Sequence, residues 1–498
     1  MGYGAVLRER VPAIKFLVNA QKTVWYPILF AVLCIISGSS SHEVYLPIIF
    51  ILCSFVIFSA LFTDDNKVFL TPMLMIYYSL GMDNPKANPG GMENDSLLSS
   101  FDFDSFKVII ICGIMVVAIF VTRLIADGSI ARIFKQRRIG AIGILALDVA
   151  LLTNGLFNPN YTPMTLLYGA IMAISLTFFY FLCAGMLSKS KSEDIIPYAC
   201  KAMVCTAYVA LCQFLIKAVW AYSEGILFNV APGTDVLRIN RSVLSLAWGL
   251  PTMISAVFVL GIPAAFYLAR NHKYGILSCL SAVAFLVGTF MINTRSAMLV
   301  GVVAFMVCAF MCCLKNEKHP ANALCCRIMS ALFLVGIGYL VVKIISVEGG
   351  IHTIMDMLRL EDYSDNTRIQ MWKTGLDHFL ANPIFGSGFD TGSNITNNVF
   401  SSMYHCIIVQ ALGSMGIFGA AALLTHFTTF AVIFFKKFSL NKFLLLLIPL
   451  MLLGMSLVDN FFFYPNSQIF YCVFIVLAEI ITQGDRESPQ EDVSCTAN

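Results

Sequence analysis

Runs of apolar residues long enough to cross a lipid bilayer recur from one end of this sequence to the other. Stretches of about 18 or more apolar residues with few charges are typical of transmembrane helices. Hydrophobic residues make up 58% of the chain and charged residues only 12%, which leaves too little polar surface for a soluble domain. The sequence therefore predicts an all-α, polytopic integral membrane protein with about 12–14 transmembrane helices and one long extracytoplasmic loop.

This pattern divides the chain into five parts. They are a basic cytoplasmic leader (1–23), transmembrane helices 1–11 (24–346), the long extracytoplasmic loop with an amphipathic helix (347–402), transmembrane helices 12–14 (403–482) and a disordered cytoplasmic tail (483–498). The third predicted transmembrane helix, 68–82, is short, so a re-entrant segment is an alternative. The eighth is expected to begin at residue 243.

Lysine and arginine residues set the predicted orientation, because cytoplasmic loops carry an excess of both. With the N-terminus placed inside, about 22 of the 32 basic residues fall on the inner side and about 10 on the outer side. Every second loop is basic. The sequence therefore predicts an even number of crossings, with both termini in the cytoplasm.

Several arginines left on the outer side lie at predicted helix ends or in the long loop. They are Arg238, Arg241, Arg295 and Arg368. An arginine at a membrane boundary is often a snorkelling anchor, and this alternative stands for each of them. Arg295 has the least freedom to reach water, because it sits in the tight turn between two predicted helices.

An enzyme on the outer face of a cell membrane has no nucleotide pool, so its donor must carry an activated bond of its own. A lipid diphosphate is the natural candidate, and arginines bind phosphate bidentately and stay charged at any relevant pH. The attacking hydroxyl needs a base, for which histidine is the usual choice near neutral pH. His405 is the candidate because it borders a predicted helix at the end of the long loop; a hydrogen-bonded interfacial histidine is the alternative.

Several short motifs in the last 210 residues or so resemble the O-antigen ligase and polymerase superfamily. An Arg-Ser turn precedes a helix, a loop of the form R…W…hPhhGhG follows, and a histidine with a Gln five residues on leads into a Gly-x-x-Gly region. Here these are Arg295-Ser296, Arg368 with Trp372, 382–388 (NPIFGSG), His405 with Gln410, and Gly416 with Gly419. One departure is Cys406, where the family usually has Asn.

The resemblance implies a metal-independent glycosyltransferase that needs no cofactor and acts on undecaprenyl-diphosphate-linked oligosaccharides at the bacterial cytoplasmic membrane. By this resemblance Arg241 and Arg295 hold the diphosphate, with Arg238 an equal contender for the role of Arg241. His405, together with Arg295, is catalytic. The implied loop residues that bind substrate are Arg368, Trp372 and Gln410.

The implied partners are the lipid-linked oligosaccharide and membrane lipids, with a flippase and a chain-length regulator of the same pathway as further candidates and no nucleic acid. The activity expected first is polymerisation of repeat units into O-antigen, capsule or exopolysaccharide. A ligase that moves the glycan to another acceptor is an alternative. A flippase is a second alternative, although transporters tend to show internal repeats and charges near the midplane.

A few other features compete for attention. Asp102 and Asp104 form a DxD pattern typical of metal sites, but such a pattern arises easily by chance in an acidic loop. Asp148 lies in the middle of the fifth predicted helix and is either functional or a structural hydrogen-bonding group. If His405 is not the base, Asp365, Asp377 and Asp390 are next in line. The amphipathic segment around Trp372 either lies on the membrane surface or packs over the helices.

Overall fold

The computed structural model describes most of the chain. The described residues are 3–39, 42–79, 114–115, 117–118, 120–125, 128, 138–187, 192–230, 237–246, 248–272, 275–314, 319–346, 367–389 and 404–483. The predicted fourth transmembrane helix, the DxD pattern, Asp365, Asp390 and the C-terminal tail lie wholly or mostly outside them.

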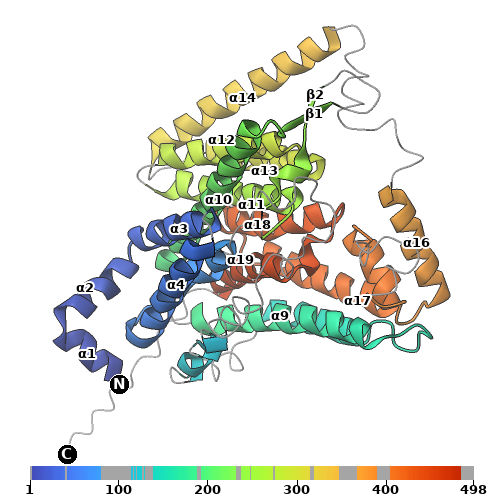
Figure 1. The fold of residues 1–498 in the computed structure, drawn as a ribbon, viewed down its shortest axis with the longest axis horizontal. Helices are drawn as coiled ribbons and strands as arrows, with labels where there is room; N and C mark the ends of the chain where they lie inside the picture. Colours follow the sequence, from blue (N-terminus) through green and yellow to red (C-terminus); the bar gives the residue numbers. More distant parts are fainter. Residues whose placement is uncertain are drawn as a thin grey trace, which may run out of the picture.

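The described residues form helices and one short hairpin (Figure 1). The N-terminal part holds α1 (Tyr3–Arg10), α2 (Pro12–Gln21), α3 (Trp25–Gly38), α4 (His42–Phe62), η1 (Asn66–Phe69), α5 (Leu70–Met75), η2 (Ile76–Ser79), α8 (Ile139–Leu152), α9 (Pro163–Leu187) and α10 (Ser192–Ser223). The rest holds β1 (Phe228–Val230), β2 (Leu237–Ile239), η3 (Arg241–Leu244), α11 (Pro251–Asn271), α12 (Gly275–Ile292), α13 (Arg295–Cys313), α14 (Pro320–Ser346), α16 (Thr367–Ala381), α17 (Ile407–Phe435), α18 (Leu440–Ser456), η5 (Phe461–Phe463) and α19 (Pro465–Gln483). The strands β1 and β2 pair antiparallel.

Long apolar helices dominate this architecture and confirm the prediction of an all-α polytopic membrane protein. In the described part of the chain, 7 helices are long and apolar enough to cross a membrane, or up to 8 if the bent pair α2–α3 counts as one. Four shorter apolar helices lie in α4, α8, α14 and α18. The total number of spans and the sidedness of the protein stay predictions.

Two predicted helices differ from the structure. The segment 68–82 is broken into η1, α5 and η2, and α5 has only 6 residues, which rise about 9 Å and cannot cross a bilayer. The eighth helix begins at Pro251 rather than residue 243. Pro251 occupies the first turn of α11, after the extended residue Leu250, and proline favours this position because its missing N–H needs no partner there.

Hydrogen bonds between helix ends define the two ends of the bundle. Asn271, the last residue of α11, donates its side-chain amide to Asn441 near the start of α18, 3.1 Å away. Arg270 donates to the carbonyl oxygen of Leu314, just after α13, 3.4 Å away. Since α11, α13 and α18 have 21, 19 and 17 residues and so similar lengths, the starts of α11 and α13 lie at the same end as the end of α18.

In Figure 1, α16 lies beside α17 on the right of the view, and α1 and α2 lie on the left. We call the end that carries α16 and the starts of α11 and α13 the α16 end. The α16 end also holds the start of α9, because Asn158 in the α8–α9 turn donates its side-chain amide to the carbonyl oxygen of Ser387, 2.7 Å away. The two termini of the described chain therefore lie away from the predicted site.

Candidate active site

The loop after α16 packs into a break in α17. Gly416 has φ +63° inside this helix, so the regular ladder of backbone hydrogen bonds is interrupted there. The loop replaces the missing partners: the N–H groups of Ser387 and Gly388 donate to the carbonyls of Gly413 and Ser414 over 2.8 and 3.0 Å. The N–H of Ile417 in turn donates to the carbonyl oxygen of Pro383, 2.8 Å away. The NPIFGSG motif and the Gly-x-x-Gly region are thus two halves of one structure.

The same loop is fixed on its other side by the α8–α9 turn. The N–H of Gly155 donates to the carbonyl oxygen of Phe385 over 2.8 Å, and the side chain of Asn154 accepts from the N–H of Phe389 over 3.1 Å. Gly386 has φ +70° and lies against the backbone of Ser414, where a side chain would overlap it. These contacts fix the loop between α17 and the α8–α9 turn, and glycine at residue 386 permits the close approach.

Helix α16 packs over the start of α17 and is not isolated on a membrane surface. Gly375 is buried, and a methyl group at this position would meet the ring of Tyr404 at about 3.0 Å. The hydroxyl of Tyr404 hydrogen-bonds Nδ1 of His378. Of the apolar residues of this helix, Leu376 and Leu380 remain 44% and 73% exposed, whereas Trp372 and Phe379 are half-buried, so the buried face coincides only in part with the apolar one.

His405 lies just before the start of α17, next to the turn between α18 and α19. Its Nδ1 is 2.8 Å from Oδ1 of Asp459, and its backbone has φ +50°, a left-handed conformation that a non-glycine residue rarely adopts. The His405 side chain is 30% exposed, whereas that of Asp459 is 8% exposed. A carboxylate on Nδ1 fixes the tautomer in which Nε2 is the basic nitrogen.

Asp459 is surrounded by groups that favour its charged form. Burial by itself would raise the pKa of this carboxyl, but the hydrogen bond and charge of His405 act against it. The N–H of Asn460 donates to Oδ1 over 2.9 Å, and Nη2 of Arg368 lies 3.9 Å from Oδ2. Together these groups hold the pKa of Asp459 below its usual range.

Gln410, predicted as a substrate residue, is completely buried and joins the two sides of this site. Its side-chain oxygen accepts from the N–H of Tyr404 over 2.8 Å and from the side-chain amide of Asn460 over 2.9 Å. Its own amide donates to Ser414, 2.7 Å away. Gln410 therefore links the two segments that carry His405 and Asp459, and its side chain is fully buried among these partners.

Trp372 lies one turn after Arg368 on α16 and is half-buried. Its indole N–H is buried without a hydrogen-bond partner among the described residues. An unpaired buried donor is costly, and a bound hydroxyl or phosphate oxygen would satisfy it. Arg368 and Trp372, which the sequence places in one motif, thus lie on the same helix, α16.

Arg241, one of the predicted diphosphate residues, contacts the residue before Arg295, the other, at another part of the α16 end. Arg241 begins η3, and its Nη2 donates to the hydroxyl of Thr294, 3.3 Å away. Thr294 directly precedes Arg295, the first and half-buried residue of α13. Arg238 lies in β2, where it stands opposite Asn229.

The side chains of the other residues that the sequence singles out make no described contact with the His405–Asp459 pair. Asp148 accepts a hydrogen bond from Thr177 and is buried between α8 and α9, which fits the structural alternative. Asp377 is exposed on α16. Cys406, the departure from the family pattern, is buried and precedes α17. Within the residues that the structure describes, no group of three or more His, Cys, Asp or Glu side chains is arranged to hold a metal ion.

Asp459 and Asn460 are residues of this site that the sequence did not single out. Both are buried polar residues that interrupt an apolar run between the last two helices, and this position on the predicted outer side was the available signal. Their contacts reach residues 54 and 50 positions away in the sequence, which no local pattern records.

Comparison with known proteins agrees with the resemblance noted in the sequence. Residues 280–424 match the model of a protein family described as O-Antigen ligase. The matched range holds Arg295, Arg368, Trp372, His405 and Gln410, whereas Arg241 and Asp459 lie outside it. A search of the curated proteins finds no match. Over residues 280–424 this chain is thus similar to the O-antigen ligase family.

Proposed function

We propose that the protein polymerises undecaprenyl-diphosphate-linked oligosaccharide repeat units on the outer face of the bacterial cytoplasmic membrane. The observation that carries this proposal is the His405–Asp459 pair, with 2.8 Å between Nδ1 and Oδ1, at the same end of the bundle as Arg241 and Arg295. Transfer of a glycan from a lipid diphosphate requires a base for the acceptor hydroxyl and positive charge for the leaving diphosphate. His405 with Asp459 would supply the base, and the arginines would supply the charge.

In the proposed reaction a hydroxyl of the incoming repeat unit attacks the anomeric carbon of the growing glycan. His405 takes the hydroxyl proton on Nε2 while Asp459 stabilises the imidazolium that forms. The bond between the anomeric carbon and the diphosphate oxygen breaks, and its electron pair leaves with the diphosphate. Arg241 and Arg295 stabilise this charge, an effect commonly worth about 3 kcal/mol per donor. The products are the lengthened glycan on its lipid and undecaprenyl diphosphate.

Helix α16 supplies contacts for the sugar in this proposal. Arg368 lies beside Asp459, so it is suited to orient the acceptor hydroxyls, and the half-buried Trp372 lies one turn further along the same helix. Aromatic rings commonly pack on sugar faces, because their apolar surface matches the C–H groups of the ring. Metal-free chemistry and the diphosphate donor are parts of the proposal.

A ligase is the second candidate, and the family description of the matched domain favours it. The two activities share the donor and the leaving group and differ only in the acceptor. Purified protein in detergent, given lipid-linked repeat units alone, separates them. A polymerase yields a ladder of longer glycans, a ligase leaves the repeat units unjoined until another acceptor is added, and unchanged substrate under both conditions contradicts the proposed enzyme.

The arginine assignment is tested with Arg295→Ala and Arg295→Lys, both expected to abolish product because lysine cannot form the two-pronged contact. Arg270→Lys is the matched control, since Arg270 caps the opposite end of α11 and α13, and it should keep wild-type product. Near-normal activity of Arg295→Lys would refute bidentate binding of the diphosphate.

A further inference from the structure

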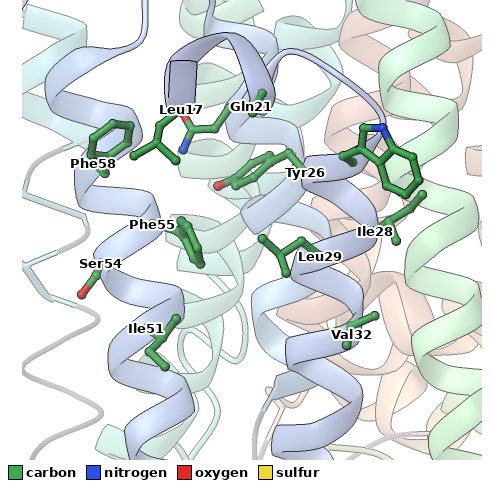
Figure 2. A pocket seen from close by; sticks show the side chains of 12 residues that line it. Leu17, Gln21, Tyr26, Ile28, Leu29, Val32, Ile51, Ser54, Phe55 and Phe58 are labelled. Carbon is green, nitrogen blue, oxygen red and sulfur yellow. The ribbon is translucent and has the colours of Figure 1, made fainter. Parts of the chain in front are cut away.

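An apolar pocket of about 680 Å³ opens between α2, α3 and α4. Figure 2 shows Phe55 and Ile51 of α4 on one wall and Tyr26 and Leu29 of α3 on the other, below Leu17 of α2. These walls belong to apolar helices of the membrane region, and Leu29 and Ile51 are 46% and 45% exposed. In a bilayer the pocket therefore opens towards lipid chains, and its shape and lining suit one of them.

One polar group in the lining lacks a partner. Gln21 is 4% exposed, and its side-chain amide donates to Ser59 over 2.9 Å. Its side-chain oxygen is buried with no hydrogen-bond partner among the described residues. A buried acceptor without a donor is costly, so a ligand that brings a hydroxyl to this place would be favoured.

Lys22 directly follows Gln21, and Arg8, Arg10 and Lys15 lie on α1 and α2. Helices α2 and α3 are bent by 81°, so α1 and α2 turn away from the direction of the membrane helices. Lys22 and Arg8 both pair with Asp64, at 2.6 and 3.2 Å. One carboxylate thus faces two basic side chains, which leaves a net positive charge in this group. Lys15 and Arg10 are exposed on the same two helices. This charge is complementary to a phosphate, as in basic amphipathic helices at membrane surfaces.

The pocket lies far from the candidate active site. Tyr198, near the start of α10, donates its hydroxyl to the backbone oxygen of Gln21, 3.2 Å away. Helix α9, which runs directly before α10, has its start at the α16 end and 25 residues to its other end, a rise of about 37 Å. The pocket therefore belongs to the opposite end of the bundle, which the sequence predicts to face the cytoplasm.

We propose that this pocket binds an anionic phospholipid of that leaflet, of the phosphatidylglycerol class. One acyl chain occupies the space between α3 and α4, a headgroup hydroxyl donates to Gln21, and the phosphate lies among the basic side chains of α1 and α2. This site is independent of the proposed glycan transfer, whose lipid diphosphate binds at the α16 end.

The test is photolabelling of the full-length protein in vesicles that contain either phosphatidylglycerol or phosphatidylcholine with a photoreactive group on one acyl chain. The phosphatidylglycerol probe should label peptides of α3 and α4, and the phosphatidylcholine probe should label them about tenfold less. Equal labelling by both probes, or labelling spread evenly over the apolar surface, would overturn the proposal.

Two variants fill the pocket from opposite walls, Leu29→Trp and Ile51→Trp, and each should lower labelling by phosphatidylglycerol about tenfold. Leu299→Trp is the matched control, because Leu299 is 69% exposed on α13 away from the pocket, and its labelling should equal wild type. Unchanged labelling in both pocket variants, with a monodisperse elution profile, contradicts the site. If one variant misfolds, the other decides.

Discussion

Asn460 donates its side-chain amide to the side-chain oxygen of Gln410 across 2.9 Å, and the same oxygen accepts from the backbone N–H of Tyr404. Tyr404 directly precedes His405, and Asn460 directly follows Asp459. The buried side chain of Gln410 on α17 therefore hydrogen-bonds both backbone segments that carry the His405–Asp459 pair. We therefore expect the geometry of that pair to depend on Gln410, whose side chain hydrogen-bonds the neighbours of both members.

Gln410→Leu should impair both stability and turnover. The substitution leaves the N–H of Tyr404 and the amide of Asn460 without their acceptor, at about 1–3 kcal/mol for each buried group, so the unfolding temperature falls. Because His405 loses its register to Asp459, kcat should fall while donor affinity is kept. Gln468→Leu is the control: Gln468 is equally buried on α19 and bonds Ser175, so it should lose stability alone. Wild-type kcat in folded Gln410→Leu protein would contradict the positioning role.

Asp459→Asn should lower turnover by about 10²–10⁴-fold, because an amide neither fixes the basic tautomer of His405 nor stabilises its cation. The pKa of Asp459 is held below its usual range. The stability that this carboxylate contributes is therefore fully present above its unfolded pKa of about 3.9 and is lost only as the pH falls through the lower folded value. Asp377→Asn, an exposed change on α16, should leave kcat unaltered; an equal loss in both variants would remove the case for Asp459.

Much of the fold follows from the length of the apolar runs. These runs predict helices over 164–187, 274–292, 296–314 and 466–482, and α9, α12, α13 and α19 begin and end within a residue or two of them. The helix around Trp372 was also predictable, because its apolar residues recur at helical spacing. Its buried face was predictable only in part, because Trp372 and Phe379 are half-buried but Leu376 and Leu380 are exposed. A glycine, Gly375, marks the contact with Tyr404, since close approach of two helices favours the smallest residue, which hydrophobicity scales do not register.

The site was predicted only in part for a related reason. His405 and the arginines are recognisable by residue type and position, and the structure joins Arg241 to the turn that carries Arg295. An acidic residue in a helix connection is common, so the sequence does not single out Asp459. Its role follows from the fold, which places it after α18 beside His405 at the start of α17. Gln410 was predicted to bind substrate, but its three hydrogen bonds lie within the protein.

Docking of α16 should weaken in mild acid. Burial lowers the pKa of His378 from its usual value of 6.5, and its neutral Nδ1 accepts the hydroxyl of Tyr404. As the pH falls below about 6.5, the undocked form gains a proton that the docked form resists, so docking loses free energy until the lower pKa is passed. The protection factors of the α16 amides, which correct for the slower intrinsic exchange in acid, should therefore be smaller at pH 5.5 than at pH 7.0, about one unit below and about half a unit above the ordinary pKa. His378→Phe should abolish the pH dependence; if it persists, another group controls docking.

Gly416→Ala tests whether the break in α17 is required by the loop that fills it. Gly416 has φ +63°, a strained conformation for alanine that costs about 1–3 kcal/mol, and the added methyl group would overlap the carbonyl oxygens of Pro383 and Ile384. The loop would have to move, and with it α16 and Arg368, so we expect a lower unfolding temperature and loss of turnover together. Gly454→Ala is the control, because a methyl group at Gly454 in α18 meets nothing within 4 Å and alanine favours a helix by about 1 kcal/mol. If Gly416→Ala behaves like Gly454→Ala, α17 straightens without penalty, and the loop 383–388 does not depend on the break.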